Sequence, residues 1–138
     1  MGMVTLMLDS TRLEIVLSAG EKALAFRTEN VIIPRDLILR VQLTDDPWTW
    51  IRGVRARGTY VPRTLAAGTW RSAAGDDFAL IRRRRPGVVV DLAGHDEFER
   101  VVLSTRHGAA LAKALHWDVA DEPADVADLA AARPSSSA

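Results

Sequence analysis

Arginine forms the clearest clusters of chemically active side chains in this sequence. One group of three lies at residues 52–57, and a run of four lies at residues 82–85. Guanidinium groups gathered on one surface bind phosphates, carboxylates and anionic membranes. Because successive side chains of a strand point to opposite faces, Arg83 and Arg85 share one face of the second run. The candidate ligand-binding residues are Arg52, Arg55, Arg57, Arg83 and Arg85.

A solvated surface is the simpler explanation for the same arginines, and we prefer it. The chain holds sixteen arginines and two lysines, a bias that a GC-rich genome produces without selection for binding. Most charge runs are solvated, and charges near a hairpin tip also keep an edge strand from pairing. We expect local neutralisation by flanking aspartates and no salt-sensitive binding to anionic vesicles. These aspartates are Asp45, Asp46, Asp76 and Asp77.

Catalytic and metal sites are not expected. The chain has no cysteine, which excludes a thiolate zinc site, a cysteine nucleophile and disulfides. No two of its three histidines are four residues apart, as a ligand pair on one helix would be, and a solvated loop position is expected for His95. No serine lies in a Gly-x-Ser-x-Gly turn, and no glycine-rich phosphate loop with its lysine is present. We therefore expect no catalytic residue, no metal and no cofactor.

The totals are those of one domain without a membrane-spanning segment. The chain has 138 residues and no net charge, and no apolar run approaches the ~18 residues that a span requires. The first residues lack the layout of a signal peptide, so a cytoplasmic location is expected. Charge is distributed unevenly. Residues 49–85 hold nine arginines and two aspartates, whereas residues 118–138 hold five acidic residues and one arginine.

Alternating apolar residues predict most of the strands. We expect strands at residues 13–17, 24–26, 31–33, 37–43, 65–71, 78–85, 88–92 and 98–104. Pro34 must end the third of these or place it at a sheet edge, and Gly68 predicts a bulge or a close backbone approach. Proline and glycine at residues 86–87 predict a type II turn that joins two strands in a hairpin. In that hairpin Arg82 faces Asp91 and forms a cross-strand ion pair.

A connection of about 17 residues follows the strand at residues 37–43. Connections of this length are uncommon in compact domains unless they have a function. Trp48, Trp50 and Ile51 are expected to anchor it as a short helical turn over one mouth of the sheet. The rest of the connection is expected to be irregular.

The order of the elements predicts a mainly β fold. Seven or eight short strands are followed by one amphipathic helix, without alternation of strands and helices. This order favours a small antiparallel sandwich or barrel with the helix closing one open end. Ser104 or Thr105 is expected to cap that helix. The core residues expected from the apolar phase of each element are Leu39, Val41, Leu80, Val90, Leu111 and Leu115.

Residues 1–117 are expected to form the domain, and residues 118–138 an acidic tail rich in alanine, proline and serine. The tail has few apolar residues and its carboxylates are spread along its first half. We therefore expect it to be marginally ordered at best. Deleting it is expected to leave thermal stability nearly unchanged.

Several short motifs follow one another along residues 13–115. They are Ile33-Pro34, Asp46-Pro47-Trp48, Arg52-Gly53-x-Arg55-x-x-Gly58, Gly68-Thr69-Trp70-Arg71, Asp77-Phe78 and Arg85-Pro86-x-Val88-Val89-Val90. In this order the chain resembles the short bacterial pleckstrin-homology-like domains of high-GC bacteria. The resemblance implies a barrel of two roughly orthogonal antiparallel sheets capped by a C-terminal helix. It supplies no catalytic residue.

The resemblance and the composition together predict a non-enzymatic binding or assembly module. The wider fold class binds proteins or phospholipid head groups, and some bacterial members assemble into rings. We therefore expect a protein partner or self-association. The alternatives are binding of an anionic surface or a phospholipid head group through the arginine-rich loops and, more remotely, hydrolysis of a small molecule. No nucleic-acid partner is expected.

Overall fold

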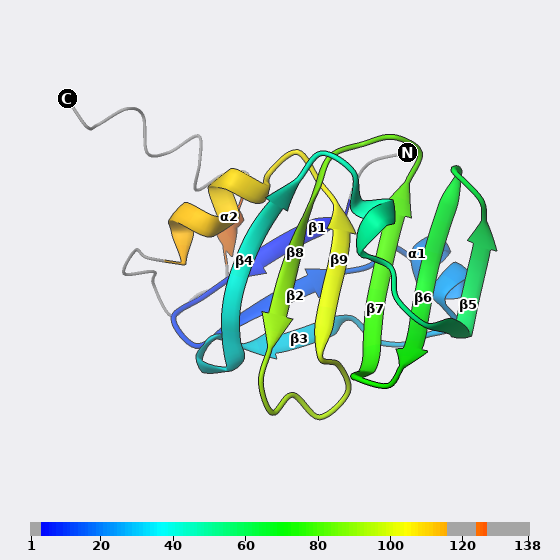
Figure 1. The fold of residues 1–138 in the computed structure, drawn as a ribbon. Helices are drawn as coiled ribbons and strands as arrows, with labels where there is room; N and C mark the ends of the chain where they lie inside the picture. Colours follow the sequence, from blue (N-terminus) through cyan, green and yellow to red (C-terminus); the bar gives the residue numbers. More distant parts are fainter. Residues whose placement is uncertain (1–3, 116–123, 127–138) are drawn as a thin grey trace.

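Among the residues that it describes, a computed structural model of the chain shows two β-sheets, two α-helices and two short 3₁₀-helices (Figure 1). It describes residues 4–115 and 124–126. The fold is mainly β, as the sequence predicts. No helix in the described part of the chain is long and apolar enough to cross a membrane.

The smaller sheet has four strands in the order β10-β1-β2-β3, each antiparallel to its neighbours. They are β1 (Thr5–Leu8), β2 (Arg12–Val16), β3 (Val31–Pro34) and β10 (Ala124–Asp125). The strands predicted at residues 13–17 and 31–33 are confirmed, and Pro34 ends an edge strand as expected. The structure adds β1 and β10 to the predicted strands.

Asp9 shapes the turn between β1 and β2. Its Oδ1 accepts hydrogen bonds from the backbone N–H groups of Thr11 and Arg12, both at 2.8 Å, and from the Thr11 hydroxyl at 3.0 Å. The two backbone hydrogen bonds hold the pKa of the Asp9 carboxyl below its ordinary value. The ionised side chain therefore stabilises the turn.

The segment around Leu24 and Phe26 is helical, so the strand predicted there is wrong. The helix α1 (Ala19–Ala25) begins with a capping box. Ser18 Oγ accepts from the Glu21 backbone N–H at 3.1 Å, and Glu21 Oε1 accepts from the Ser18 N–H at 2.8 Å. These hydrogen bonds satisfy N–H groups that the first turn leaves free. The helix ends at Phe26, whose φ is 59°.

The larger sheet has six strands in the order β4-β8-β9-β7-β6-β5. They are β4 (Ile38–Thr44), β5 (Val54–Val61), β6 (Leu65–Ser72), β7 (Gly75–Arg82), β8 (Gly87–Leu92) and β9 (Arg100–Ser104). The 3₁₀-helix η1 (Arg35–Leu37) leads into β4, and η2 (Pro47–Trp50) follows it. The predicted short helical turn is confirmed as η2. The rest of that connection holds β5, so its predicted irregularity is wrong.

β7 and β8 do not form the predicted hairpin. β9 lies between them, parallel to β7 and antiparallel to β8. The type II turn is also wrong, because Gly87 opens β8 and the positive φ, 47°, belongs to Arg83. Arg82 does not face Asp91; its Nη2 lies 3.4 Å from Glu21 Oε2. Every residue of β8 is buried, and a strand covered on both faces shows no alternation that identifies its neighbour.

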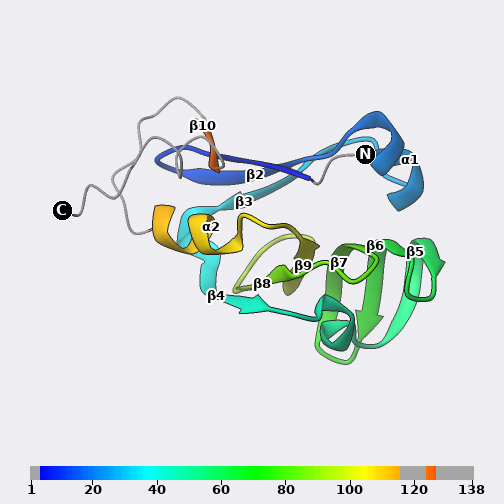
Figure 2. The same ribbon diagram turned by 90° about the horizontal axis from the view of Figure 1, so that it is seen from above.

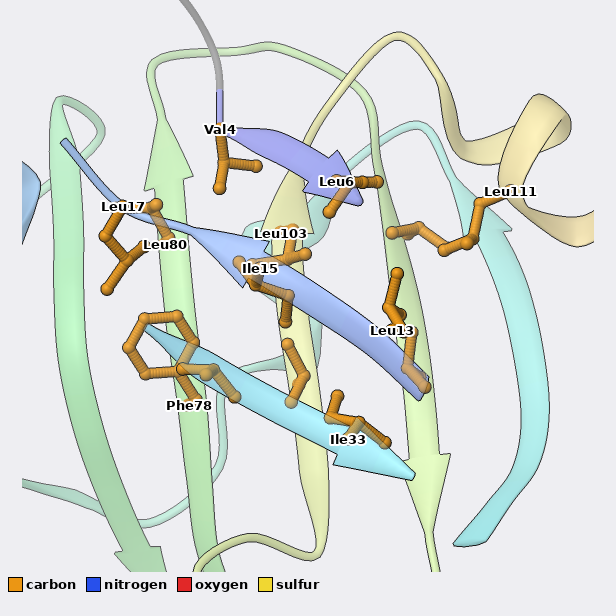
Figure 3. Packing of buried hydrophobic residues seen from close by; sticks show 14 of the residues in the cluster. Val4, Leu6, Leu13, Ile15, Leu17, Ile33, Phe78, Leu80, Leu103 and Leu111 are labelled. Atoms are coloured by element: carbon orange, nitrogen blue, oxygen red, sulfur yellow. The ribbon is translucent and has the colours of Figure 1, made fainter. Parts of the chain in front are cut away.

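The two sheets lie face to face, and the strands of the smaller sheet run across those of the larger (Figures 1 and 2). Their facing side chains form the main core, part of which is drawn in Figure 3. The parallel pairing of β7 with β9 corrects the expected all-antiparallel arrangement. Among the described residues no strand of one sheet pairs with a strand of the other, so the closed barrel is not formed.

The C-terminal helix α2 (Gly108–Ala114) packs beside β4 and buries Leu111 completely. The predicted cap of this helix is wrong. Ser104 Oγ accepts from the Arg82 N–H at 2.9 Å, and Thr105 Oγ1 accepts from the His107 N–H at 3.0 Å. Both hydroxyls therefore support the chain before the helix and leave its first turn without a side-chain cap.

Five of the six predicted core residues lie in or against the main core, and Leu39 does not. The Leu39 side chain is 68% exposed. The register of β4 against β8 shifts between Ile38 and Arg40, and such a bulge reverses the alternation of side chains. The confirmed residues are Leu80, Val90 and Leu111, which are buried, with Val41 and Leu115 packed against them.

Residues 124–126 contribute to the smaller sheet. β10 pairs with β1, which places Asp125 opposite Met7, and Val126 is fully buried in the main core. This contact counts against the expectation that the whole of residues 118–138 is dispensable. Residues 116–123 and 127–138 lie outside the described residues, and the domain boundary after residue 117 stays a prediction.

Two truncations measure the contribution of residues 124–126 to stability. A chain ending after residue 126 is expected to keep the stability of the full chain. A chain ending after residue 123 loses the burial of Val126, which is worth about 1.5–3 kcal/mol. Urea unfolding of both chains, followed by circular dichroism, checks this. Equal stability of the two chains would show that β10 contributes nothing to the fold.

Candidate functional site

A row of charged side chains crosses one end of the outer face of the larger sheet, the face turned away from the smaller sheet. Asp91 accepts a hydrogen bond from Arg100 at 2.7 Å and lies 3.3 Å from Arg40. Within the described residues Arg55 has no ion pair. The positive and negative side chains of the row therefore neutralise one another, except for Arg55 at its end. In strand order the row is Arg40, Asp91, Arg100, Asp77, Trp70 and Arg55.

Arg52, in the segment after η2, binds one carboxylate of this row. Its Nε and Nη2 donate to the two carboxylate oxygens of Asp77 at 2.6 and 3.1 Å, and the Asp77 side chain is 4% exposed. The hydrogen bonds to Asp77 raise the pKa of Arg52 above its ordinary value. Next to it, the guanidinium carbon of Arg100 lies 5.3 Å from the ring centre of Trp50. Arg52 is therefore a structural residue that fastens η2 to the sheet.

Arg52 and Arg55 should differ sharply when each is replaced by alanine. Arg52→Ala leaves the buried Asp77 carboxylate without its two hydrogen bonds and is expected to cost about 1–3 kcal/mol. Arg55→Ala removes an exposed side chain and should change stability by less than about 0.5 kcal/mol. Urea unfolding of both variants makes the comparison. Similar losses would contradict the structural role assigned to Arg52.

Tryptophans from η2 cover part of the outer face. The indole N–H groups of Trp48 and Trp50 donate to the Arg83 carbonyl at 2.6 Å and to the Thr44 hydroxyl at 3.0 Å. η2 contacts β8 and β9, whereas most of β5 stays exposed. Beneath the tryptophans lies a second apolar cluster of Ala66, Trp70, Ala79, Ile81, Val89 and Val102.

An open groove of about 850 Å³ lies beside this cover, along β5 and β6. Trp48, Tyr60 and Trp70 line it. The ring centre of Tyr60 lies 6.2 Å from that of Trp48 and 6.1 Å from that of Trp70, edge to face in both pairs. Arg55 and Arg63 also line the groove. It therefore combines aromatic surface with two guanidinium groups.

Two opposed glycines separate Tyr60 from Trp70 along the strands. Gly58 pairs with Gly68, and their φ values are 120° and 148°. A Cβ atom on Gly68 would lie 2.1 Å from the carbonyl oxygen of Arg57, so a larger residue would push the strands apart. The close approach predicted at Gly68 is confirmed. Because neither glycine has a side chain, the rings of Tyr60 and Trp70 can meet across them.

The structure places the predicted arginines at opposite ends of the larger sheet. Arg55 lies opposite Trp70, near the start of β5. Arg82 lies opposite Leu65, the first residue of β6, and residues 83–85 follow it. Trp70 and Leu65 are five residues apart on β6, and Arg83 lies one residue further, beside Thr64, so the separation is roughly 20 Å. Residues 52–57 and 82–85 therefore do not form one surface.

Arg63 is a groove residue that the sequence pattern does not single out. It occupies the turn between β5 and β6, with a φ of 63°. Within the described residues no ion pair neutralises Arg55, Arg57 or Arg63. Asp76 is hydrogen-bonded to Arg71 at 2.9 Å, which lowers the pKa of its carboxyl. Arg55 and Arg63 therefore remain available to a ligand in the groove, and Arg57 to a ligand outside it.

His95 is not the solvated loop residue that the sequence suggests. Its side chain is 3% exposed, and Nε2 lies 2.8 Å from the Ile32 carbonyl oxygen. Nδ1 accepts from the backbone N–H groups of Glu97 and Phe98, both at 3.1 Å. This geometry requires the tautomer with its proton on Nε2. His107 precedes α2, His116 lies outside the described residues, and no group of three potential metal ligands occurs in the described part of the chain.

Comparison with known proteins finds no relative of this chain. No family model matches the chain, and neither a curated protein nor a solved structure matches it. The resemblance to bacterial pleckstrin-homology-like domains stays a prediction.

Proposed function

We propose that the chain is a non-enzymatic protein-binding module whose binding surface is the groove along β5 and β6. The observation that carries this proposal is an open groove of about 850 Å³ next to an exposed edge strand. The volume lies within the range of known ligand sites, ~300–1,000 Å³. Aromatic and arginine side chains, which line this groove, are the types that dominate binding energy at protein interfaces.

The state of Asp77, the carboxylate opposite Trp70, supports binding without chemistry. Asp77 is buried and holds both hydrogen bonds of Arg52. A general base must instead reach the proton that it removes from the ligand. The described residues that line the groove offer contact surface, charge and hydrogen-bond donors, and none of them is acidic.

Binding of an anionic surface is the second candidate function. It is supported by the arginines at residues 83–85, for which no ion pair occurs within the described residues. These arginines lie roughly 20 Å from Arg55 along the strands. A flat surface would therefore meet one group of arginines at a time, and we still expect no binding to anionic vesicles.

Peptide selection on the immobilised protein tests the main proposal. Twelve-residue peptides selected from a random library are expected to shift the amide resonances of β5 and the indole resonances of Trp48 and Trp70. Tyr60→Ala should weaken their binding about tenfold, as expected when a central interface aromatic is lost. Ile32→Ala, a change of an exposed residue on the smaller sheet, serves as the control. Binders that perturb another face, or vesicle sedimentation that depends on residues 83–85, would contradict the proposal.

A further inference from the structure

We propose that the free edge of β5, beside the groove, takes an acidic segment in extended conformation, which joins the larger sheet as a seventh strand. This inference rests on the proposed function and names the chemistry of the partner. Addition of a strand to an exposed sheet edge is a general mode of peptide recognition, in which backbone hydrogen bonds supply affinity and side-chain contacts supply specificity.

The free edge of β5 provides the backbone groups for such a strand. β5 pairs only with β6 among the described strands and is the outermost strand of the larger sheet in Figures 1 and 2. Its register shifts between Arg55 and Arg57, so the start of the strand is irregular. From Gly58 to Val61 the pairing is regular, which leaves a short uninterrupted edge for a partner. Tyr60 lies in this part and is 44% exposed.

Arginines stand at both ends of that regular edge. Arg57 precedes it and pairs with Thr69, on the face of the sheet opposite the groove. Arg63 follows it in the turn to β6 and lines the groove. Arg57 also adds its charge to the neighbourhood of Asp76, but the hydrogen bonds of that carboxylate go to Arg71. Carboxylates at the two ends of an added strand would form charge-assisted hydrogen bonds with these guanidinium groups.

The same charges disfavour a second copy of β5 as the occupant. Pairing of two β5 strands would place the arginines of one copy next to those of the other, and like charges side by side weaken a sheet. A nucleic acid is disfavoured by the burial of Trp70. Trp70 is 4% exposed and meets Tyr60 edge to face, so its ring offers no free surface for a base to stack on. An acidic polypeptide in extended conformation can pair with the free edge of β5 and neutralise the arginines at its ends.

A set of synthetic peptides tests the inference on the full chain. The probe is an acetylated, amidated peptide Glu-Val-Thr-Val-Thr-Val-Glu, titrated into labelled protein at low ionic strength. It should bind about tenfold more tightly than the same peptide with lysine at both ends, because two attractive pairs become repulsive. N-methylation of alternate backbone amides removes strand pairing but keeps the charges. It should weaken binding about tenfold as well.

Charge reversal in the protein supplies the complementary test. Arg57→Glu combined with Arg63→Glu should remove the preference for the acidic peptide and transfer it to the lysine peptide. Arg106→Glu, an exposed arginine before α2, is the matched control and should leave the preference unchanged. Equal binding of the glutamate and lysine peptides along β5 would overturn the acidic partner while leaving the groove as a protein-binding surface. Binding of single-stranded oligothymidylate in place of peptide would overturn both proposals.

Discussion

Replacement of Phe78 by alanine is expected to lower the free energy of unfolding by about 3–5 kcal/mol, the usual cost of removing a buried aromatic ring. Phe78 is fully buried, and its ring centre lies 5.6 Å from that of Phe98. The guanidinium carbon of Arg27 lies 5.8 and 5.5 Å from the two ring centres, and its nitrogens donate to Glu97 at 3.0 and 3.2 Å. Figure 3 shows the Phe78 ring between the two sheets, beside β3. Its loss therefore opens a cavity and removes a partner of Arg27.

Phe26→Ala provides the control for this prediction. Phe26 follows α1 and its side chain is 61% exposed, so the same substitution should change stability by less than about 0.5 kcal/mol. Urea unfolding monitored by circular dichroism compares the two variants at one pH and temperature. A Phe78→Ala protein as stable as Phe26→Ala would mean that the sheets do not pack as described.

Apolar alternation predicted the strands that have one buried face and one open face. The strand predicted at residues 13–17 is β2, and its inward side chains Leu13 and Ile15 are fully buried. β5 carries no such alternation because it is an edge strand with exposed residues on both faces. Its glycine and arginines are typical of a loop. The strand forms because β6 pairs with it, which is a tertiary cause that local propensity does not contain.

Unlike β5, the helix α1 has a start signal that can be recognised in the sequence. Ser18 followed three residues later by Glu21 is a capping box. Apolar residues at positions 24 and 26 suggested a strand, but two residues are a weak alternation. A helix start that satisfies free N–H groups outweighs so short a pattern. In β4 a bulge at Leu39 reversed an alternation that was otherwise regular.

The candidate site depends on strand order, which the sequence pattern did not establish. The groove requires β5 beside β6, and the charged row requires β9 between β7 and β8. Arg52 and Asp77, 25 residues apart, meet only in that order. The interrupted strand at Gly68 was predictable, since glycine in a strand marks a close approach of backbones. The pairing partner, Gly58, was not.

Leu111→Ala is the second large effect that we expect, with a loss of about 2–5 kcal/mol. α2 has seven residues, too few for a helix to be stable by itself in water. Its position depends on packing. Leu111 is fully buried, and in Figure 3 it points from α2 towards Leu6 and Leu13. At the helix end, Arg35 Nη2 donates to the Leu115 carbonyl at 2.8 Å.

The matched control is Leu39→Ala, the same substitution on the neighbouring strand β4, where the side chain is exposed. It should cost less than about 0.5 kcal/mol, because little apolar surface returns to water. The difference in the free energy of unfolding between the two variants therefore measures the effect of burying a leucine, because both leucines lie near or on α2 but only Leu111 is buried. Amide hydrogen exchange adds a second measurement, since Leu111→Ala should lower the protection of residues 111–115 well before the sheets lose theirs. If both leucine variants were equally mild, α2 would be attached through Arg35 rather than through the core.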